Sequence, residues 1–153
     1  MNSRPLNILL ADDDTDDCNF FEKALEEISI ATKLQIVNDG EELMNYLSDN
    51  LVRTQNYTPL PDVIFLDLSM PRKTGFECLT EIKQNEKLKD IQVVMFSTSY
   101  LRDYDYEKQI INILKGLGAD DYIRKRGGFE QLKQVINEAL IKVKEKRGKK
   151  YEL

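Results

Sequence analysis

Short apolar runs alternate along the whole chain with segments whose apolar residues recur every three or four positions. The runs predict strands at about 7–11, 34–37, 63–66, 91–96 and 121–125, and the recurring residues predict helices around 16–28, 43–47, 75–82, 110–117 and 129–143. The third run, Val63–Leu66, is apolar at every position, which is typical of a strand buried on both faces. Five strand–helix units predict an α/β fold with a doubly wound, five-stranded parallel sheet.

The length of 153 residues fits one domain, which we place at residues 1–147, followed by a flexible basic tail at 148–153. The polar stretch 49–61, with Pro59 and Pro61, is predicted to be the longest loop. We find no apolar stretch of membrane-spanning length and no signal-peptide pattern. Together with two isolated cysteines, Cys18 and Cys78, this indicates a cytoplasmic protein with reduced thiols.

Charge and residue usage exclude several functions. The chain has no histidine, so histidine catalysis, imidazole metal sites and a phosphohistidine of its own are excluded. The net charge is −5, although residues 142–150 carry +5. These lysines suit the solvated end of a helix better than a nucleic-acid or lipid surface, because no aromatic residues are interleaved with them. We therefore expect neither direct DNA binding nor membrane binding.

Polar residues stand where the apolar strands end. Asp12, Asp13 and Asp14 follow the first strand, Asp67 follows the third, and Ser97 and Lys125 come at the ends of the last two. The carboxyl ends of parallel strands share one edge of the sheet, where ligands bind. Helix capping accounts for Asp14, Asp16 and Asp17, but not for Asp12 and Asp13 directly after a buried strand. Carboxylates gathered in this way predict a Mg²⁺ site.

A carboxylate beside Mg²⁺ can act as a nucleophile. Asp67 would attack a phosphoryl group and form an acyl phosphate, with Lys125 holding the phosphoryl oxygens as a point charge. Ser97 could donate a hydrogen bond to the same oxygens. The sequence thus points to a metal-assisted phosphate site.

In these residues the chain resembles a receiver domain of a two-component response regulator, of the CheY-like, stand-alone type. The resemblance extends over about residues 6–140 and rests on motifs in a fixed order: Ile8–Asp14, Asp39-Gly40, Pro61–Pro71, Gly75, Ser97, Gly118-Ala119, Tyr122 and Lys125. It implies a flavodoxin-like (βα)5 fold with strand order 2-1-3-4-5.

The resemblance also implies a role for each matching residue. Asp67 is the phosphoacceptor, Lys125 binds the phosphoryl group, and Ser97 and Tyr122 form the switch that follows phosphorylation. The expected Mg²⁺ ligands are Asp12, Asp13, Asp67 and the backbone carbonyl of Ser69.

The implied partners are a sensor histidine kinase or phosphotransfer protein and a downstream protein, with a phosphorylation-dependent dimer as a further expectation. As a switch the chain would not be an enzyme, apart from catalysing its own phosphorylation and dephosphorylation. Two alternatives stay open: a receiver-fold scaffold that is never phosphorylated, and an aspartyl-phosphate hydrolase of the haloacid dehalogenase type.

The chain departs from the receiver pattern in two places. Arg126 follows Lys125 where the family usually has a proline, so Lys125 would be held differently, with Gly127-Gly128 supplying the turn. The tyrosine-rich segment 99–108 is longer than usual and precedes the fourth helix, where family members usually dock partners. Its tyrosines would form either an interaction surface or an irregular loop.

Overall fold

The computed structural model describes residues 4–52, 59–97, 104–125 and 127–150, and its strands form one parallel sheet. The strands are β1 (Leu6–Ala11), β2 (Thr32–Val37), β3 (Val63–Leu66), β4 (Gln92–Ser97) and β5 (Asp121–Arg124). Their order in the sheet, β2-β1-β3-β4-β5, confirms the doubly wound topology and the strand order expected from the sequence.

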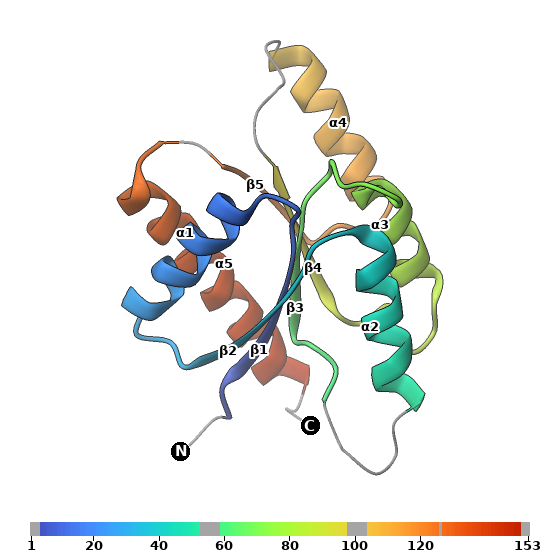
Figure 1. Cartoon of the computed structure of the whole chain (residues 1–153), viewed down its shortest axis with the longest axis horizontal. Helices are drawn as coiled ribbons and strands as arrows, with labels where there is room; N and C mark the ends of the chain where they lie inside the picture. Colours follow the sequence, from blue (N-terminus) through green and yellow to red (C-terminus); the bar gives the residue numbers. More distant parts are fainter. Residues whose placement is uncertain (1–3, 53–58, 98–103, 126, 151–153) are drawn as a thin grey trace.

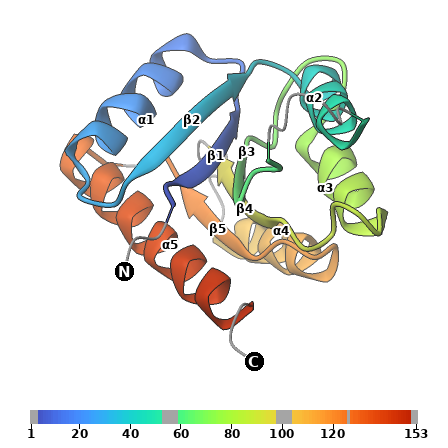
Figure 2. The ribbon, with the colours of Figure 1, turned by 90° about the horizontal axis from the view of Figure 1, so that it is seen from below.

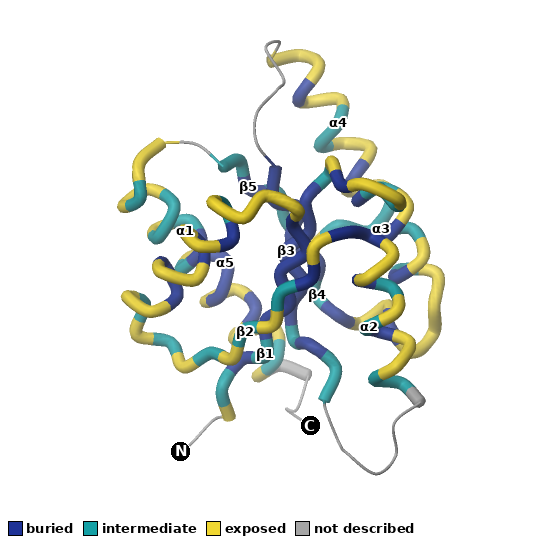
Figure 3. The backbone as a smooth tube through the Cα atoms, viewed as in Figure 1, coloured by how far each residue is buried: buried dark blue, intermediate teal, exposed yellow. Residues whose placement is uncertain are grey.

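Helices cover both faces of this sheet (Figure 1 and Figure 2). α1 (Thr15–Glu27) and α5 (Phe129–Lys150) lie on one face, and α2 (Gly40–Val52), α3 (Gly75–Gln84) and α4 (Tyr104–Gly116) lie on the other. Because the inner strands β1, β3 and β4 are buried on both sides, alternate residues of one strand enter different cores. Figure 3 shows the inner strands buried between helices whose outer faces are exposed.

Aromatic residues form the centre of the core under α1 and α5. Phe21, Phe65 and Phe96 are fully buried and meet edge to face, with ring centroids 4.9 to 6.1 Å apart. Such aromatic contacts contribute about 0.5–1.5 kcal/mol per pair beyond the burial of area. They join α1, β3 and β4, and Asp67 follows β3 while Ser97 ends β4.

Local capping explains where two of the helices start. The Asp14 carboxylate accepts a hydrogen bond from the backbone N–H of Asp17, which fixes the first turn of α1. Thr74 and Glu77 form a reciprocal capping box at the start of α3. The prediction that capping accounts for Asp14 is confirmed.

Three element boundaries differ from the sequence prediction. α2 continues to Val52, so residues 49–52 are helical rather than loop; Leu51 keeps the helical spacing and packs against the core. α4 already begins at Tyr104. The sequence pattern did not predict this start, because the first turn buries a charged residue, Glu107, rather than an apolar one. Residues 104–108 are therefore helix, and 99–103 lie outside the described residues.

The third difference concerns the basic tail. α5 extends through Lys150, so residues 148–150 of the expected tail continue the last helix, and residues 151–153 lie outside the described residues. The end of this helix lies beside the amino ends of the strands, where Lys146 and Arg147 meet acidic residues. In the part of the chain that the structure describes, no helix is long and apolar enough to cross a lipid bilayer.

Candidate functional site

Backbone hydrogen bonds place the polar strand-end residues at the carboxyl edge of the sheet. The N–H of Asp12 donates to Val37, that of Asp67 to Ala11, and that of Lys125 to Ser97, at 2.7 to 3.0 Å. Each bond extends the pairing of two parallel strands by one residue beyond the end of the strand. The three side chains are thus held on rigid backbone, as the sequence pattern predicted.

Three carboxylates gather at this edge. One carboxylate oxygen each from Asp12, Asp13 and Asp67 lies within 4.8 Å of the others. Asp12 and Asp67 are buried, and Asp13 is exposed. Hard oxygen ligands of this kind, with an open side toward solvent, fit a divalent cation such as Mg²⁺. Asp14 is not part of this group, because its carboxylate caps α1.

Ser69 lies directly beyond the third strand end and is exposed. Its backbone N–H donates a long hydrogen bond of 3.4 Å to Asp67 Oδ1. The proposed role of its carbonyl oxygen as a metal ligand stays a prediction.

Lys125 provides the positive charge of the site. Its Nζ donates hydrogen bonds to Asp12 Oδ2 and, at 3.0 Å, to Asp17 Oδ2, and it lies 3.9 Å from Asp67 Oδ2. The aliphatic stem is buried, and Nζ lies 5.0 Å from the centroid of the Phe96 ring. Burial lowers the pKa of Lys125, but the carboxylates, Asp67 first, outweigh it and raise the pKa.

Burial governs the protonation of the central carboxylate. It raises the pKa of Asp67 to about 7, with Lys125 acting in the opposite direction and Asp12 and Asp13 adding to the increase. Burial also raises the pKa of Asp12, against the effect of its hydrogen bond from Lys125. Both carboxylates are thus costly to ionise at this edge without more positive charge than one lysine supplies, and a bound cation would favour their charged form.

Gly75 allows the chain to pass close to Asp67. A β-carbon at this position would lie 2.3 Å from the Asp67 carbonyl oxygen and 2.9 Å from the Cα of Leu68. The Gly75 N–H donates to the Leu68 carbonyl at 3.0 Å, so α3 starts directly against the turn that follows β3. A larger residue would displace the backbone that carries Asp67.

Ser97 and Tyr122 lie side by side on the α4 side of the sheet. In the β4–β5 register Met95 pairs with Tyr122 and Ser97 with Arg124, so these side chains share one face. Burial raises the pKa of the Tyr122 phenol, and the neighbouring Ser97 hydroxyl lowers it. The structure thus brings the two predicted switch residues together.

Two charged residues of this region were missed by the sequence analysis. Glu107 of α4 is buried, and its Oε2 lies 2.8 Å from Arg124 Nε, which ties the first turn of α4 to β5. Asp17 was interpreted as a helix-capping residue, yet its carboxylate binds Lys125. The acidic first turn of α1 was the available signal, but it fits capping equally well.

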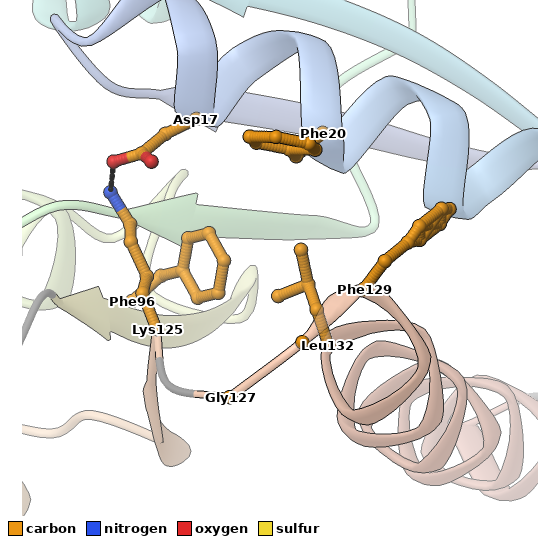
Figure 4. A pocket seen from close by; sticks show the side chains of 8 residues that line it. Asp17, Phe20, Phe96, Lys125, Gly127, Phe129 and Leu132 are labelled. Carbon is orange, nitrogen blue, oxygen red and sulfur yellow. Dashed lines mark hydrogen bonds and ion pairs between the residues drawn. The ribbon is translucent and has the colours of Figure 1, made fainter.

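A pocket of about 310 Å³ opens beside Lys125, between α1 and the start of α5 (Figure 4). Phe20, Phe96, Phe129 and Leu132 line its apolar part, and the bonded pair of Asp17 and Lys125 lies at one end. Gly127, at φ +76°, makes the turn that leads into α5, as expected for a glycine. Arg126, the departure from the family pattern, lies outside the described residues.

Comparison with known proteins agrees with this geometry. Residues 8–137 match the model of the response regulator receiver domain. The response regulator Rcp1 of Synechocystis sp. (strain ATCC 27184 / PCC 6803 / Kazusa) is 38% identical over 99 residues, which are 65% of this chain and 66% of Rcp1. The chain thus spans just under two thirds of that relative.

Solved structures show the same fold. The phosphorylated cyanobacterial phytochrome response regulator RcpA superposes with a TM-score of 0.73 at 32% identity, covering 89% of this chain and 91% of RcpA. The Mn²⁺-bound form of Rcp1 gives a TM-score of 0.72 at 31% identity, covering 88% and 91%. The chain belongs to the response regulator receiver domain family of two-component signalling.

Proposed function

We propose that this receiver domain is a signalling switch that accepts a phosphoryl group on Asp67. The observation that carries the proposal is the setting of this carboxylate, which lies beside those of Asp12 and Asp13 and 3.9 Å from the ammonium of Lys125. The relatives support it, since RcpA has been crystallised phosphorylated and Rcp1 with Mn²⁺. Because the chain has no histidine, the donor would be the phosphohistidine of a partner kinase or phosphotransfer protein.

In the transfer step, an Asp67 carboxylate oxygen attacks the phosphorus atom while the phosphorus–nitrogen bond of the donor breaks. The electron pair of that bond stays on the imidazole nitrogen, and an acyl phosphate forms on Asp67. Water later attacks the phosphorus and releases phosphate, which restores the carboxylate.

The residues around Asp67 stabilise the charge of the phosphoryl group. Asp12, Asp13, Asp67 and the Ser69 carbonyl would hold Mg²⁺, which when bound neutralises charge on the phosphoryl oxygens. Lys125 contributes a further positive charge, and the Ser97 hydroxyl donates a hydrogen bond.

Phosphorylation then biases a two-state element. The Ser97 hydroxyl moves toward the phosphoryl group, and Tyr122, which lies beside it, follows. Glu107 and Arg124 link the first turn of α4 to the strand that carries Tyr122, so a change at Tyr122 reaches α4. The signal leaves through contacts with a downstream protein or through a phosphorylation-dependent dimer.

Labelling with a small acyl phosphate tests the proposal. We expect stoichiometric, Mg²⁺-dependent incorporation into the intact chain, abolished by Asp67→Asn and unchanged by Asp16→Asn, which alters an exposed aspartate nearby. Intact-mass spectrometry gives the stoichiometry, and thermal melting shows that the variants fold. No incorporation from any donor would leave the scaffold alternative, and multiple turnover of a phosphate ester would favour the hydrolase.

A further inference from the structure

Lys125 is bound to Asp12, directly after β1, and to Asp17, in the first turn of α1, rather than to Asp67. Two of the three ammonium protons are directed to Asp12 and Asp17, and the distance to Asp67 Oδ2, 3.9 Å, exceeds that of a hydrogen bond. Figure 4 shows the Asp17 carboxylate reaching from α1 to Lys125 at the end of the pocket. A closer approach of Nζ to a phosphoryl group on Asp67 therefore works against these two hydrogen bonds.

The two carboxylates that bind Lys125 differ in burial. The Asp12 side chain is fully buried, whereas that of Asp17 is 27% exposed. Removing the lysine from Asp12 would leave a buried carboxylate uncompensated, which is costly, but water can solvate Asp17 when the lysine leaves. The contact with Asp17 is the one that can be released.

The backbone of Asp17 is fixed independently of Lys125. Its N–H donates to the Asp14 cap, so only its side chain has to rotate when the contact breaks. Asp17 also lies outside the cluster of Asp12, Asp13 and Asp67. It can therefore influence the lysine without taking part in the proposed metal site.

We infer that Asp17 is a positioning residue that holds Lys125 away from Asp67 and competes for it with the phosphoryl group. The inference rests on the proposed role of Asp67 as phosphoacceptor. A phosphoryl group carries a charge of about −1.5 to −2 and attracts the ammonium more strongly than the single, partly exposed carboxylate of Asp17 does. Phosphorylation then draws Lys125 off α1 and leaves Asp17 unpaired at the end of the pocket.

The chain departs from the family pattern at the same lysine. Receivers usually have a proline directly after it, and this chain has Arg126 and then Gly127 in the left-handed conformation. The contact with Asp17 supplies a side-chain anchor for the lysine from a different element, α1.

Binding of beryllofluoride, which mimics a phosphoryl group on a carboxylate, tests the inference. Its dissociation constant is measured by calorimetry with saturating Mg²⁺ for the wild type, Asp17→Asn, Asp17→Glu and Asp16→Asn. We expect Asp17→Asn to bind about three- to tenfold more tightly, since a partly exposed charged pair no longer has to break. Asp17→Glu keeps the carboxylate and should stay within about twofold of the wild type.

The Asp16→Asn variant controls for charge alone. Asp16 is exposed in the same turn, and within the described residues it forms no ion pair with Lys125. Equal affinities of Asp16→Asn and Asp17→Asn would overturn the inference, as would weaker binding by Asp17→Asn. A wild type that binds beryllofluoride but shows no Asp17 effect refutes the inference alone, whereas a wild type that neither binds it nor is labelled refutes the proposed function as well.

Discussion

The two edges of the sheet use aspartate in opposite ways. At the carboxyl edge four carboxylates share one lysine, namely those of Asp12, Asp13, Asp17 and Asp67 around Lys125. At the amino edge Asp62 and Asp120 each have two cationic partners. The first arrangement leaves excess negative charge for a ligand to neutralise, and the second stabilises the fold.

Asp62 shows how completely the amino edge is paired. Its two oxygens accept hydrogen bonds of 3.0 Å from Arg4, and Oδ2 also accepts the Asn7 N–H at 2.8 Å. Arg147, from the end of α5, lies 3.6 Å away. One carboxylate thus joins the start of β1, the start of β3 and the last helix.

Asp120 repeats this arrangement before β5. Its Oδ2 accepts the Val93 N–H at 2.8 Å and the Lys83 ammonium at 3.1 Å, and Lys146 lies 3.8 Å from Oδ1. Lys83 also donates to the carbonyl of Ile91 at 2.8 Å. Asp120, like Asp62, is thus neutralised by cations of the chain itself.

Removing Asp62 should have the largest effect on stability. Asp62→Ala leaves two guanidinium groups and the Asn7 N–H without their acceptor, and we expect a loss of about 2–4 kcal/mol in the free energy of unfolding. Urea denaturation measures it, and Asp90→Ala, at an exposed aspartate before β4, should change the same quantity by less than about 0.5 kcal/mol. Phosphoryl labelling at low temperature should stay unchanged. A loss of labelling would contradict the view that the amino edge stabilises the fold and only the carboxyl edge binds a ligand.

The carboxyl edge should gain stability when it loses charge. Folding raises the pKa of Asp67 from 3.8 to about 7. Between pH 3.8 and about 7, the folded chain therefore holds a proton on Asp67 that the unfolded chain has lost. The resulting penalty is absent below about pH 4, grows as the pH rises toward 7 and is complete above it.

Asp67→Asn removes this penalty. We compare the free energy of unfolding of the variant with that of the wild type in the absence of metal. The difference in favour of the variant should be roughly 1–2 kcal/mol larger at pH 8 than at pH 5. Urea denaturation in a chelator at both pH values measures the difference, and Mg²⁺ should reduce it at pH 8 by stabilising the wild type. The same difference at both pH values would show that the Asp67 pKa is not raised.

The smallest effect is expected at the exposed rim of the amino edge. Lys146 is half exposed, and it meets Asp120 at 3.8 Å and the Gln92 amide oxygen at 3.1 Å. Lys146→Ala should cost less than about 0.5 kcal/mol, and salt should remove that cost. A loss above about 1 kcal/mol in thermal or urea unfolding would mean that the end of α5 contributes more to the fold than its exposure indicates.

The strand-end residues were predictable because strand pairing is regular. An apolar run marks a buried strand, and the next residue must lie at the carboxyl edge whatever the rest of the chain does. This reasoning placed Asp12, Asp67 and Lys125 together from the sequence. It also separated Asp14 from the metal cluster, since capping is a local property of the helix that follows.

Partners across the fold were not predictable in the same way. Glu107 and Arg124 are 17 positions apart and pair only because α4 packs beside β5. Without that partner in view, a charged Glu107 gave no sign of a buried helical turn, and the start of α4 was missed. The basic end of α5 was expected to be solvated, yet Arg147 reaches Asp62 from 85 positions away. A residue pattern reports burial along its own element but does not identify the partner on another.

The sequence by itself determined the alternating strands and helices, the two-sided burial of the sheet and the edge at which Asp67 lies. These follow from local periodicity and from the geometry common to all parallel strands. Only the tertiary structure decided which carboxylates Lys125 binds, because Asp17 reaches it across the gap between α1 and β5. The sequence determined the place of the reactive carboxylate, and packing determined the charges around it.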